Sequence, residues 1–402
     1  MDRKELLIFI ILCLFIAGGL FGTVVWLVLI PVCIGLSILN LRKGIRKYPP
    51  KVNLADIFVL AVILSEILSI LFSRYRSNSI RSSFPIVLAA FFWFFFRGHA
   101  LSEKTRYYLD FGLSGLSAIF SIITIVGFIS FKKKFAIFAP ISLVEFKQRF
   151  FPGGMPINDW VVFLLCLLPF PFNLALTKTK KWIMVVALLA AALSLVAIGL
   201  CLSRGAYVAA SVFYGMGIIG AFLKDKKANE NKVVIMVVTI ILGCVGLLPV
   251  RQEVMTTLSM SKTSTQVRST HGRFQQMSDA VILWKEKPWA GVGGGNFNLA
   301  YDSAMDDEEL STVRATSTYS LILVEKGLVG AIAYMGLMLS ILFLGLSRYR
   351  KRDVGPFFLA GFTALCVRGL FFTSFFYYRI ALTLVVLLAL LSVQEAESRS
   401  HE

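Results

Sequence analysis

Charged side chains are scarce in this 402-residue sequence, where Asp, Glu, Lys and Arg together make up only 16% of the residues. Hydrophobic residues make up 57%, and the mean hydropathy is +0.77. A water-soluble domain cannot bury so large an apolar surface. The composition therefore excludes a soluble globular protein and predicts a protein embedded in a lipid bilayer.

Cysteine and histidine are rare as well, with six and three copies. All six cysteines fall inside apolar runs, without paired spacing and without histidine or carboxylate ligands nearby. Such an arrangement is typical of packing residues and predicts neither disulfides nor a metal site. Metal-binding carboxylate motifs are missing too, so we expect a function without a metal or another cofactor.

Long apolar runs dominate the chain instead. A membrane-spanning helix needs about 20 mostly apolar residues to cross about 30 Å of hydrocarbon. The first run follows the charged start Asp2-Arg3-Lys4 as in a signal peptide, but no small-residue cleavage site precedes polar sequence, which favours an uncleaved hairpin. We therefore expect an all-α polytopic membrane protein that forms a single integral domain, 1–402. Its twelve predicted spans are 6–21, 23–41, 54–72, 83–97, 109–131, 161–177, 183–202, 205–223, 233–250, 319–346, 356–372 and 376–393.

The net charge of +18 is unevenly distributed. Lys and Arg crowd into short loops that alternate with loops poorer in both, which is the positive-inside pattern and not a nucleic-acid footprint. This pattern predicts a bacterial cytoplasmic membrane protein with both termini in the cytoplasm and with membrane lipids as neighbours. The basic loops lie at 42–47, 178–181, 224–227 and 348–352.

Two longer connections then face outward. Segment 132–160 is amphipathic and interrupted by Pro140 and by Pro152-Gly153-Gly154, which predicts an outer interfacial loop. Segment 251–318 is the only long hydrophilic stretch and is predicted to form a large extracytoplasmic loop. A loop of that length with its own helical pattern is usually functional.

A glycine-rich run, 291–297, follows the helical pattern of this loop after Lys287-Pro288. Its glycines permit positive φ angles and a close approach of the backbone. A phosphate-cradling loop is one interpretation, but neither a preceding strand nor a following Lys-Ser/Thr pair is present. The run is more typical of a tight turn at the membrane surface.

Arginines gather where the predicted helices meet the outer interface. A charge costs about 2.5–3.5 kcal/mol at the bilayer centre on insertion scales, so charges near the membrane tend to mark substrate paths. Each guanidinium by itself is compatible with snorkelling to headgroups, but the group favours an anion site, because the planar fork of arginine fits phosphate oxygens. These arginines are Arg204, Arg251, Arg268, Arg273, Arg314, Arg368 and Arg379.

Three patterns in this region resemble the O-antigen ligase and polymerase superfamily. The first is Leu-Ser-Arg-Gly-Ala at 202–206. The second consists of Gly272-Arg273 followed by Trp284, Pro288, Gly291, Gly293 and Phe297. The third is Thr-Ser-Thr-Tyr at 316–319 with Glu-Lys-Gly-Leu-Val-Gly at 325–330. At the positions of this third pattern, members of the family commonly have His-Asn or His-Ser, then an aromatic residue, and then Glu-x-Gly-Leu-x-Gly. The order and spacing carry the likeness over about residues 190–345.

The resemblance implies a membrane glycosyltransferase fold of the C type. Members take a glycan from an undecaprenyl-pyrophosphate carrier and join it, without a metal, to a saccharide or lipid-linked acceptor. Arg204 and Arg273 match the family arginines thought to hold the pyrophosphate, and fixed cations suit a leaving group that gains negative charge. Residues Thr316, Ser317 and Tyr319 would line the acceptor side.

The sequence departs from the family at Thr316, which stands where the family has a histidine proposed to help deprotonate the acceptor. A threonine hydroxyl cannot act as a general base near neutral pH. His271 is the one histidine that the topology allows near the site, and Glu325 or a carboxylate of 306–309 is the alternative base. Otherwise the acceptor needs little base assistance, or this member is impaired.

The leading hypothesis is an inverting, metal-independent ligase or polymerase of lipid-linked glycans at the outer face of the membrane. One rival is a transporter or flippase, which would need polar residues through the membrane interior and repeat symmetry between halves. No convincing repeat is present, and Asp56, Glu66 and Asp110 lie toward the ends of their runs. A non-catalytic scaffold for polysaccharide assembly is the other alternative.

Overall fold

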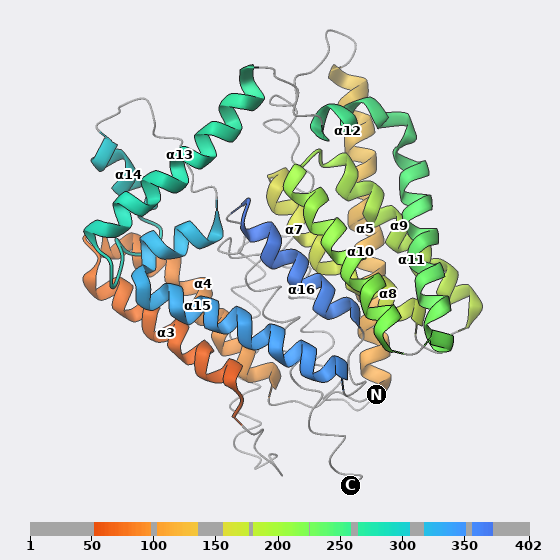
Figure 1. Cartoon of the computed structure of the whole chain (residues 1–402), viewed down its shortest axis with the longest axis horizontal. Helices are drawn as coiled ribbons and strands as arrows, with labels where there is room; N and C mark the ends of the chain where they lie inside the picture. The colour runs from red at the N-terminus through yellow and green to blue at the C-terminus, as the bar shows by residue number, and fades with distance from the viewer. Residues whose placement is uncertain are drawn as a thin grey trace. The chain divides into compact units, whose positions relative to one another are not determined.

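The computed structural model describes residues 52–97, 103–135, 156–176, 180–224, 226–258, 264–305, 317–350 and 356–372. Within these ranges the chain forms helices joined by short turns, without strands (Figure 1). Six of the described helices are long and apolar enough to cross a membrane. The all-α polytopic class is thus confirmed. The predicted spans 6–21, 23–41 and 376–393 lie outside the described residues, so the count of twelve stays a prediction.

The chain divides into two compact units, each assembled from separate stretches of sequence. Unit 1 comprises 1–101, 267–347 and 369–402, and unit 2 comprises 102–266 and 348–368. The described helices of unit 1 are α3 (Leu54–Phe72), α4 (Arg76–Arg97), most of α13 (Ser264–Glu286), α14 (Phe297–Met305) and most of α15 (Thr318–Arg350).

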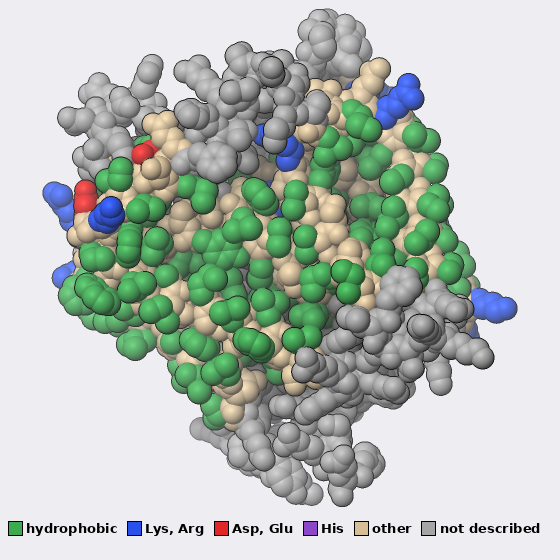
Figure 2. Space-filling view, viewed as in Figure 1, with side chains coloured by type: hydrophobic (Ala, Val, Ile, Leu, Met, Phe, Trp, Pro, Cys, Tyr) green, Lys and Arg blue, Asp and Glu red, His purple; other side chains and the backbone are tan. Residues whose placement is uncertain are grey.

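Helix α3 has a polar buried side and an apolar exposed side. It begins with a capping box in which Asn53 Oδ1 accepts the Asp56 N–H at 3.0 Å and Asp56 Oδ2 accepts the Asn53 N–H at 2.8 Å. Ser65 and Glu66 are buried, whereas Leu60 and other large apolar side chains are exposed. This distribution fits a helix whose outer face contacts lipid. Figure 2 shows apolar side chains over most of the described surface in that view.

One predicted boundary in the membrane region needs correction. Helix α4 begins at Arg76, so the loop predicted before residue 83 is reduced to a turn after Ser73, because polar and arginine residues can continue a helix past its apolar part. The predicted span 161–177 corresponds to one candidate membrane span, Ile157–Ala175, which contains α7 (Ile157–Leu167) and α8 (Pro169–Leu176). Leu168 between them keeps helical backbone angles, although Pro169 has no N–H to donate to the preceding turn.

The longer helices of unit 2 pack against one another through small and hydroxyl side chains. Ser194 Oγ lies 2.7 Å from Ser117 Oγ and 3.1 Å from Ser121 Oγ, which joins α9 to α5. A Cβ atom added to Gly199 or Gly243 would collide with a leucine side chain of the facing helix, so α9 and α11 approach closely there. The other helices of this unit are α5 (Glu103–Phe135), α9 (Lys181–Leu200), α10 (Arg204–Lys224), α11 (Lys226–Leu247), η2 (Leu248–Val250), α12 (Arg251–Leu258) and α16 (Pro356–Gly369).

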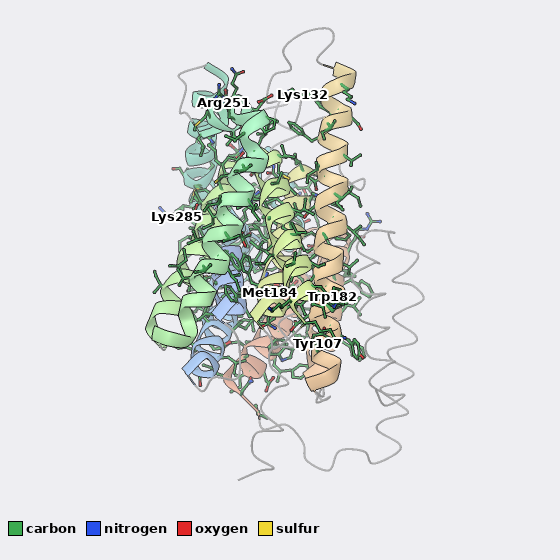
Figure 3. All side chains as sticks on the ribbon, turned by 90° about the vertical axis from the view of Figure 1, so that its right-hand side faces the viewer. Tyr107, Lys132, Trp182, Met184, Arg251 and Lys285 are labelled. Carbon is green, nitrogen blue, oxygen red and sulfur yellow. The ribbon has the colours of Figure 1, made fainter. Side chains whose placement is uncertain are left out.

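Lys132 and Arg251 lie at one end of unit 2, whereas Tyr107 and Trp182 lie at the opposite end (Figure 3). An ion pair of 2.5 Å between Lys132 Nζ and Glu253 Oε1 joins α5 to α12 at the first of these ends, which we call the Lys132 end. The two segments predicted to face outward, 132–160 and 251–318, therefore begin at the same end of the unit. The membrane side that this end faces stays a prediction.

Candidate functional site

Arg204 is the first residue of α10 and follows a very short turn. Helix α9 ends at Leu200, and the turn reverses the chain within Cys201, Leu202 and Ser203. Leu202 has a φ angle of 50°, a left-handed conformation that costs free energy for a residue with a Cβ atom. The surrounding helices thus hold this turn in a strained conformation, and Arg204 projects from a defined position at the helix start.

Asn158 links this turn to Arg368 within unit 2. Its Oδ1 atom accepts a hydrogen bond from Ser203 Oγ at 3.3 Å and one from Arg368 Nη2 at 3.2 Å. Arg368 lies in the last turn of α16 and is 3% exposed. The structure therefore brings Arg368, predicted as a secondary anion contact, beside the turn that carries Arg204. Sequence reasoning missed Asn158, because a single asparagine at the start of an apolar helix carries no pattern.

The predicted helix in the large loop exists as α13, which carries Arg268, His271 and Arg273. The side chains of these three residues lie outside the described part of the structure.

Of the remaining predicted site residues, Arg314, Thr316 and Arg379 lie outside the described residues. Ser317 is buried and caps α15, since its Oγ atom accepts the Tyr319 N–H at 3.3 Å. Its hydroxyl also donates to the Gly369 carbonyl at 3.4 Å. Ser317 thus has a structural role in fixing the start of α15, and Tyr319 follows on the first turn with a partly buried side chain.

The glycine-rich run forms a tight turn that docks on a kink in α15. Gly327 interrupts that helix with φ 63° and ψ −164°. On either side of the kink, the Gly293 N–H donates to the Glu325 carbonyl at 3.0 Å and the Leu328 N–H to the Pro288 carbonyl at 2.8 Å. The predicted tight turn is confirmed, and the backbone amide of Gly293 is used within the protein instead of facing a ligand.

Two glycines make this docking sterically feasible. A Cβ atom on Gly291 would lie 2.4 Å from the Glu325 carbonyl carbon, and one on Gly327 would lie 2.3 Å from the Trp289 carbonyl oxygen. Both residues have positive φ angles. The glycines of the two sequence patterns are therefore explained by one feature, a close backbone contact between the turn and the kink.

The Glu325 carboxylate lies at the N-terminus of α14. Its Oε1 atom accepts the Phe297 N–H at 3.1 Å, and the residue is only 5% exposed. An oxygen acceptor there satisfies a backbone N–H that has no partner within the helix. The glutamate of the pattern thus acts as a cap for α14, a role that sequence reasoning did not assign to it.

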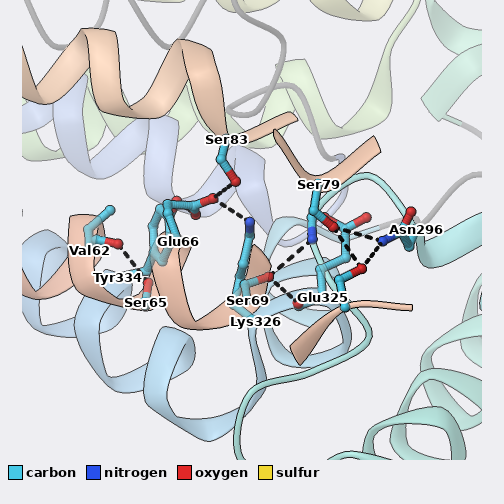
Figure 4. Close-up of polar contacts among 12 residues, drawn as sticks. Val62, Ser65, Glu66, Ser69, Ser79, Ser83, Asn296, Glu325, Lys326 and Tyr334 are labelled. Atoms are coloured by element: carbon cyan, nitrogen blue, oxygen red, sulfur yellow. Dashed lines mark hydrogen bonds and ion pairs between the residues drawn. The ribbon is translucent and has the colours of Figure 1, made fainter. Parts of the chain in front are cut away.

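A buried polar network continues from the turn into α3 and α4 (Figure 4). The Asn296 amide donates to Ser73 Oγ at 2.9 Å and to Ser79 Oγ at 3.0 Å. The Gly294 N–H donates to Ser69 Oγ at 3.1 Å, and Ser69 Oγ in turn donates to the Glu325 carbonyl at 3.1 Å. The large loop is therefore anchored to the membrane helices of unit 1 through hydroxyl groups.

Glu66 and Lys326 form a buried ion pair in the same region. The Glu66 carboxylate also accepts hydrogen bonds from Ser83 Oγ and, at 2.7 Å, from Tyr334 Oη. Sequence reasoning placed Glu66 toward the end of its span and gave it no partner. The available signal was the spacing of Ser65, Glu66 and Ser69, which places polar groups along one side of an apolar helix.

Within the described ranges, no group of three His, Cys, Asp or Glu residues is placed to hold a metal ion. In unit 2, the Arg368 guanidinium and the Ser203 hydroxyl meet the Asn158 amide. In unit 1, serine hydroxyls contact Asn296 and Glu66. Guanidinium and amide groups are in general able to bind anions and hydroxyl groups.

Residues 189–335 match the family model described as O-antigen ligase. This segment is therefore similar to the O-antigen ligase family. The match confirms the resemblance predicted over about 190–345, and it includes the Arg204 turn, α13, the glycine-rich turn and the Gly327 kink. No curated protein matches the chain.

The O-antigen ligase segment extends over parts of both units and omits two residues described above. Asn158 and Arg368 lie before and after residues 189–335. The hydrogen bonds at Asn158 therefore connect the family segment, through Ser203, to helices α7 and α16 that flank it in the sequence.

Proposed function

We propose that this protein transfers a glycan from an undecaprenyl-pyrophosphate carrier to a saccharide or lipid-linked acceptor. The transfer would occur at the outer face of a bacterial cytoplasmic membrane, as in an O-antigen ligase or a polysaccharide polymerase. The observation that carries the proposal is the O-antigen ligase match across the segment that presents Arg204 at the start of α10.

The proposed reaction is an inverting displacement without a metal. The acceptor hydroxyl oxygen attacks the anomeric carbon, the bond from that carbon to the phosphate oxygen breaks, and the carrier pyrophosphate leaves with the electron pair. Arg204 and Arg273 bind the pyrophosphate and stabilise its growing negative charge. Arg268, Arg314, Arg368 and Arg379 act as secondary anion contacts.

The proton of the acceptor hydroxyl requires a base, and we assign that role to His271. An imidazole titrates near neutral pH and so suits proton transfer. Glu325 is the second candidate, and its carboxylate is buried and accepts the Phe297 N–H. This engagement supports a capping role for Glu325 over a catalytic one. Thr316, Ser317 and Tyr319 are proposed to border the acceptor.

The experiment uses purified full-length protein in lipid nanodiscs with a defined undecaprenyl-pyrophosphate glycan and a panel of saccharide and carrier-linked acceptors. Covalent product is scored for Arg204→Ala and Arg273→Ala. Each change is expected to lower kcat/KM for the donor by about 100-fold or more, as for loss of one charge-stabilising donor. Arg76→Ala, which removes an exposed arginine from the start of α4, is the matched control and retains activity. Equal product from all variants would exclude the pyrophosphate assignment.

The buried Glu66–Lys326 pair favours one second candidate, a transporter or flippase for the lipid-linked glycan. Ionisable residues within membrane helices often line transport paths. The same nanodisc preparation fused into vesicles distinguishes the two functions. Translocation of the carrier-linked glycan without covalent product for any acceptor supports transport, and product without translocation supports transfer. A scaffold role predicts neither.

A further inference from the structure

Asn158 occupies an unusual position among the helix ends of unit 2. It is the second residue of α7, and it touches two elements that lie far from it in the sequence. Its single Oδ1 atom receives the Ser203 hydroxyl from the turn before α10 and the Arg368 guanidinium from the end of α16. Three helix ends thus converge on one amide oxygen.

This convergence lies at the Lys132 end of unit 2. Trp160 Nε1 in the first turn of α7 donates to Thr124 Oγ1 at 2.7 Å, toward the end of α5 that carries Lys132. Helix α9 begins near Tyr107 at the opposite end, where Tyr107 packs against the apolar cluster that contains Ile183, so the last residues of α9 approach the Lys132 end. Arg204 and Arg368 are therefore presented at the end predicted to face the lipid-linked donor.

The Asn158 Oδ1 atom, which accepts both hydrogen bonds, belongs to a neutral amide. An amide oxygen orients a guanidinium through a hydrogen bond but contributes no negative charge of its own. A carboxylate in the same place would hold the guanidinium more strongly and would neutralise it. Asn158 has the acceptor geometry of an aspartate without the charge.

We infer that Asn158 is a positioning residue for the donor: its amide oxygen holds the Arg368 guanidinium beside the Arg204 turn so that both arginines bind one pyrophosphate group. This inference rests on the proposed function. It adds a residue outside the family segment, and it gives Arg368 a direct part in binding the carrier pyrophosphate.

Replacing Asn158 by aspartate separates positioning from a purely structural role, because the two predict opposite results. If Asn158 only joins three helix ends, Asn158→Asp strengthens the hydrogen bond to Arg368, the thermal midpoint stays or rises, and the kinetics do not change. If Asn158 positions Arg368 for pyrophosphate, the new carboxylate occupies the guanidinium and repels the donor. KM for the donor then rises by about tenfold or more while KM for the acceptor is unchanged.

The measurements use the full-length protein in nanodiscs, with the defined donor and acceptor of the preceding assay and with thermal unfolding in parallel. Asn298→Asp, which adds the same charge at an exposed position of α14, is the matched control and keeps the donor KM of the unaltered protein. An unchanged donor KM in Asn158→Asp, with a stable fold, overturns the inference.

A double-mutant cycle keeps the inference testable if Asn158→Asp does not fold. Asn158→Ala is expected to lower kcat/KM for the donor about tenfold in the presence of Arg368 but to have little further effect in an Arg368→Ala background. Additive losses overturn the inference. Failure of the proposed function gives a different result, because Arg204→Ala then retains full activity, whereas failure of the inference alone leaves Arg204→Ala impaired.

Discussion

The Lys326 ammonium and the Glu66 carboxylate form an ion pair inside unit 1, with side chains that are 1% and 0% exposed. Lys326 immediately precedes the Gly327 kink, and Glu66 lies on α3, so the pair joins the kink to a helix 260 positions away in the sequence. Two buried charges are stable only when they are paired and accept or donate further hydrogen bonds. Here the hydroxyl groups of Ser83 and Tyr334 donate such hydrogen bonds to the Glu66 carboxylate.

Removing one partner of this pair is expected to destabilise the protein strongly. Glu66→Gln or Lys326→Met alone leaves the other group buried without its counter-charge, at a cost of about 3–5 kcal/mol. The double variant Glu66→Gln/Lys326→Met removes both charges and should recover most of that loss. Thermal and denaturant unfolding in nanodiscs measures both effects. Single variants as stable as the double variant would contradict the pairing.

Gly327 and Gly291 are predicted to tolerate no side chain. Alanine at either position meets backbone atoms closer than 3 Å and also requires a positive φ angle, so each change should cost about 2 kcal/mol or more. Gly115→Ala is the control, because a Cβ atom there has no neighbour within 4 Å. That change in the interior of α5 should be neutral or should stabilise by about 0.5–1 kcal/mol. Unfolding midpoints of the three variants provide the comparison.

If Glu325 caps α14 and His271 is the general base, substitutions of the two residues should have different effects on product formation. Glu325→Gln keeps an oxygen that can accept the Phe297 N–H, so product formation should stay within about threefold of the unaltered protein. His271→Ala should lower kcat by about 100-fold or more if the imidazole is the base. Single-turnover product formation measures both. An inactive Glu325→Gln variant beside a fully active His271→Ala variant would assign the base to α15.

The hydroxyl contacts between α5 and α9 are expected to matter much less. Ser194→Ala removes hydrogen bonds to Ser117 and Ser121, yet bonds of this kind within a membrane average about 0.6 kcal/mol. The variant should therefore lose less than about 1.5 kcal/mol of stability and keep its activity. A loss as large as that of the Glu66 variants would show that these serines form part of a larger coupled network.

Several local features were predictable because they depend on short stretches of sequence. The span 54–72 coincides with α3, the helix in the large loop is present as α13, and the glycine-rich run is a tight turn. An error arose where polar residues extend a helix beyond its apolar part, as at Arg76. Hydropathy reflects how favourably a residue enters lipid, so it does not show where polar residues extend a helix beyond the apolar run.

The sequence by itself indicated the membrane environment and the resemblance of one segment to a known family. In a bilayer the backbone must satisfy its own hydrogen bonds, so long apolar runs become helices almost irrespective of their neighbours. The order of Arg204, Arg273 and the glycine patterns was sufficient to indicate an O-antigen ligase segment, which the match to residues 189–335 supports.

Only the tertiary structure decided which polar groups meet. Asn158 and Arg368 are 210 positions apart, and Glu66 and Lys326 are 260 apart. Their contacts depend on how each helix is rotated and which helix packs beside it. Those choices follow from close packing of small residues and from the high cost of an unpaired polar group in lipid, neither of which has a short sequence pattern.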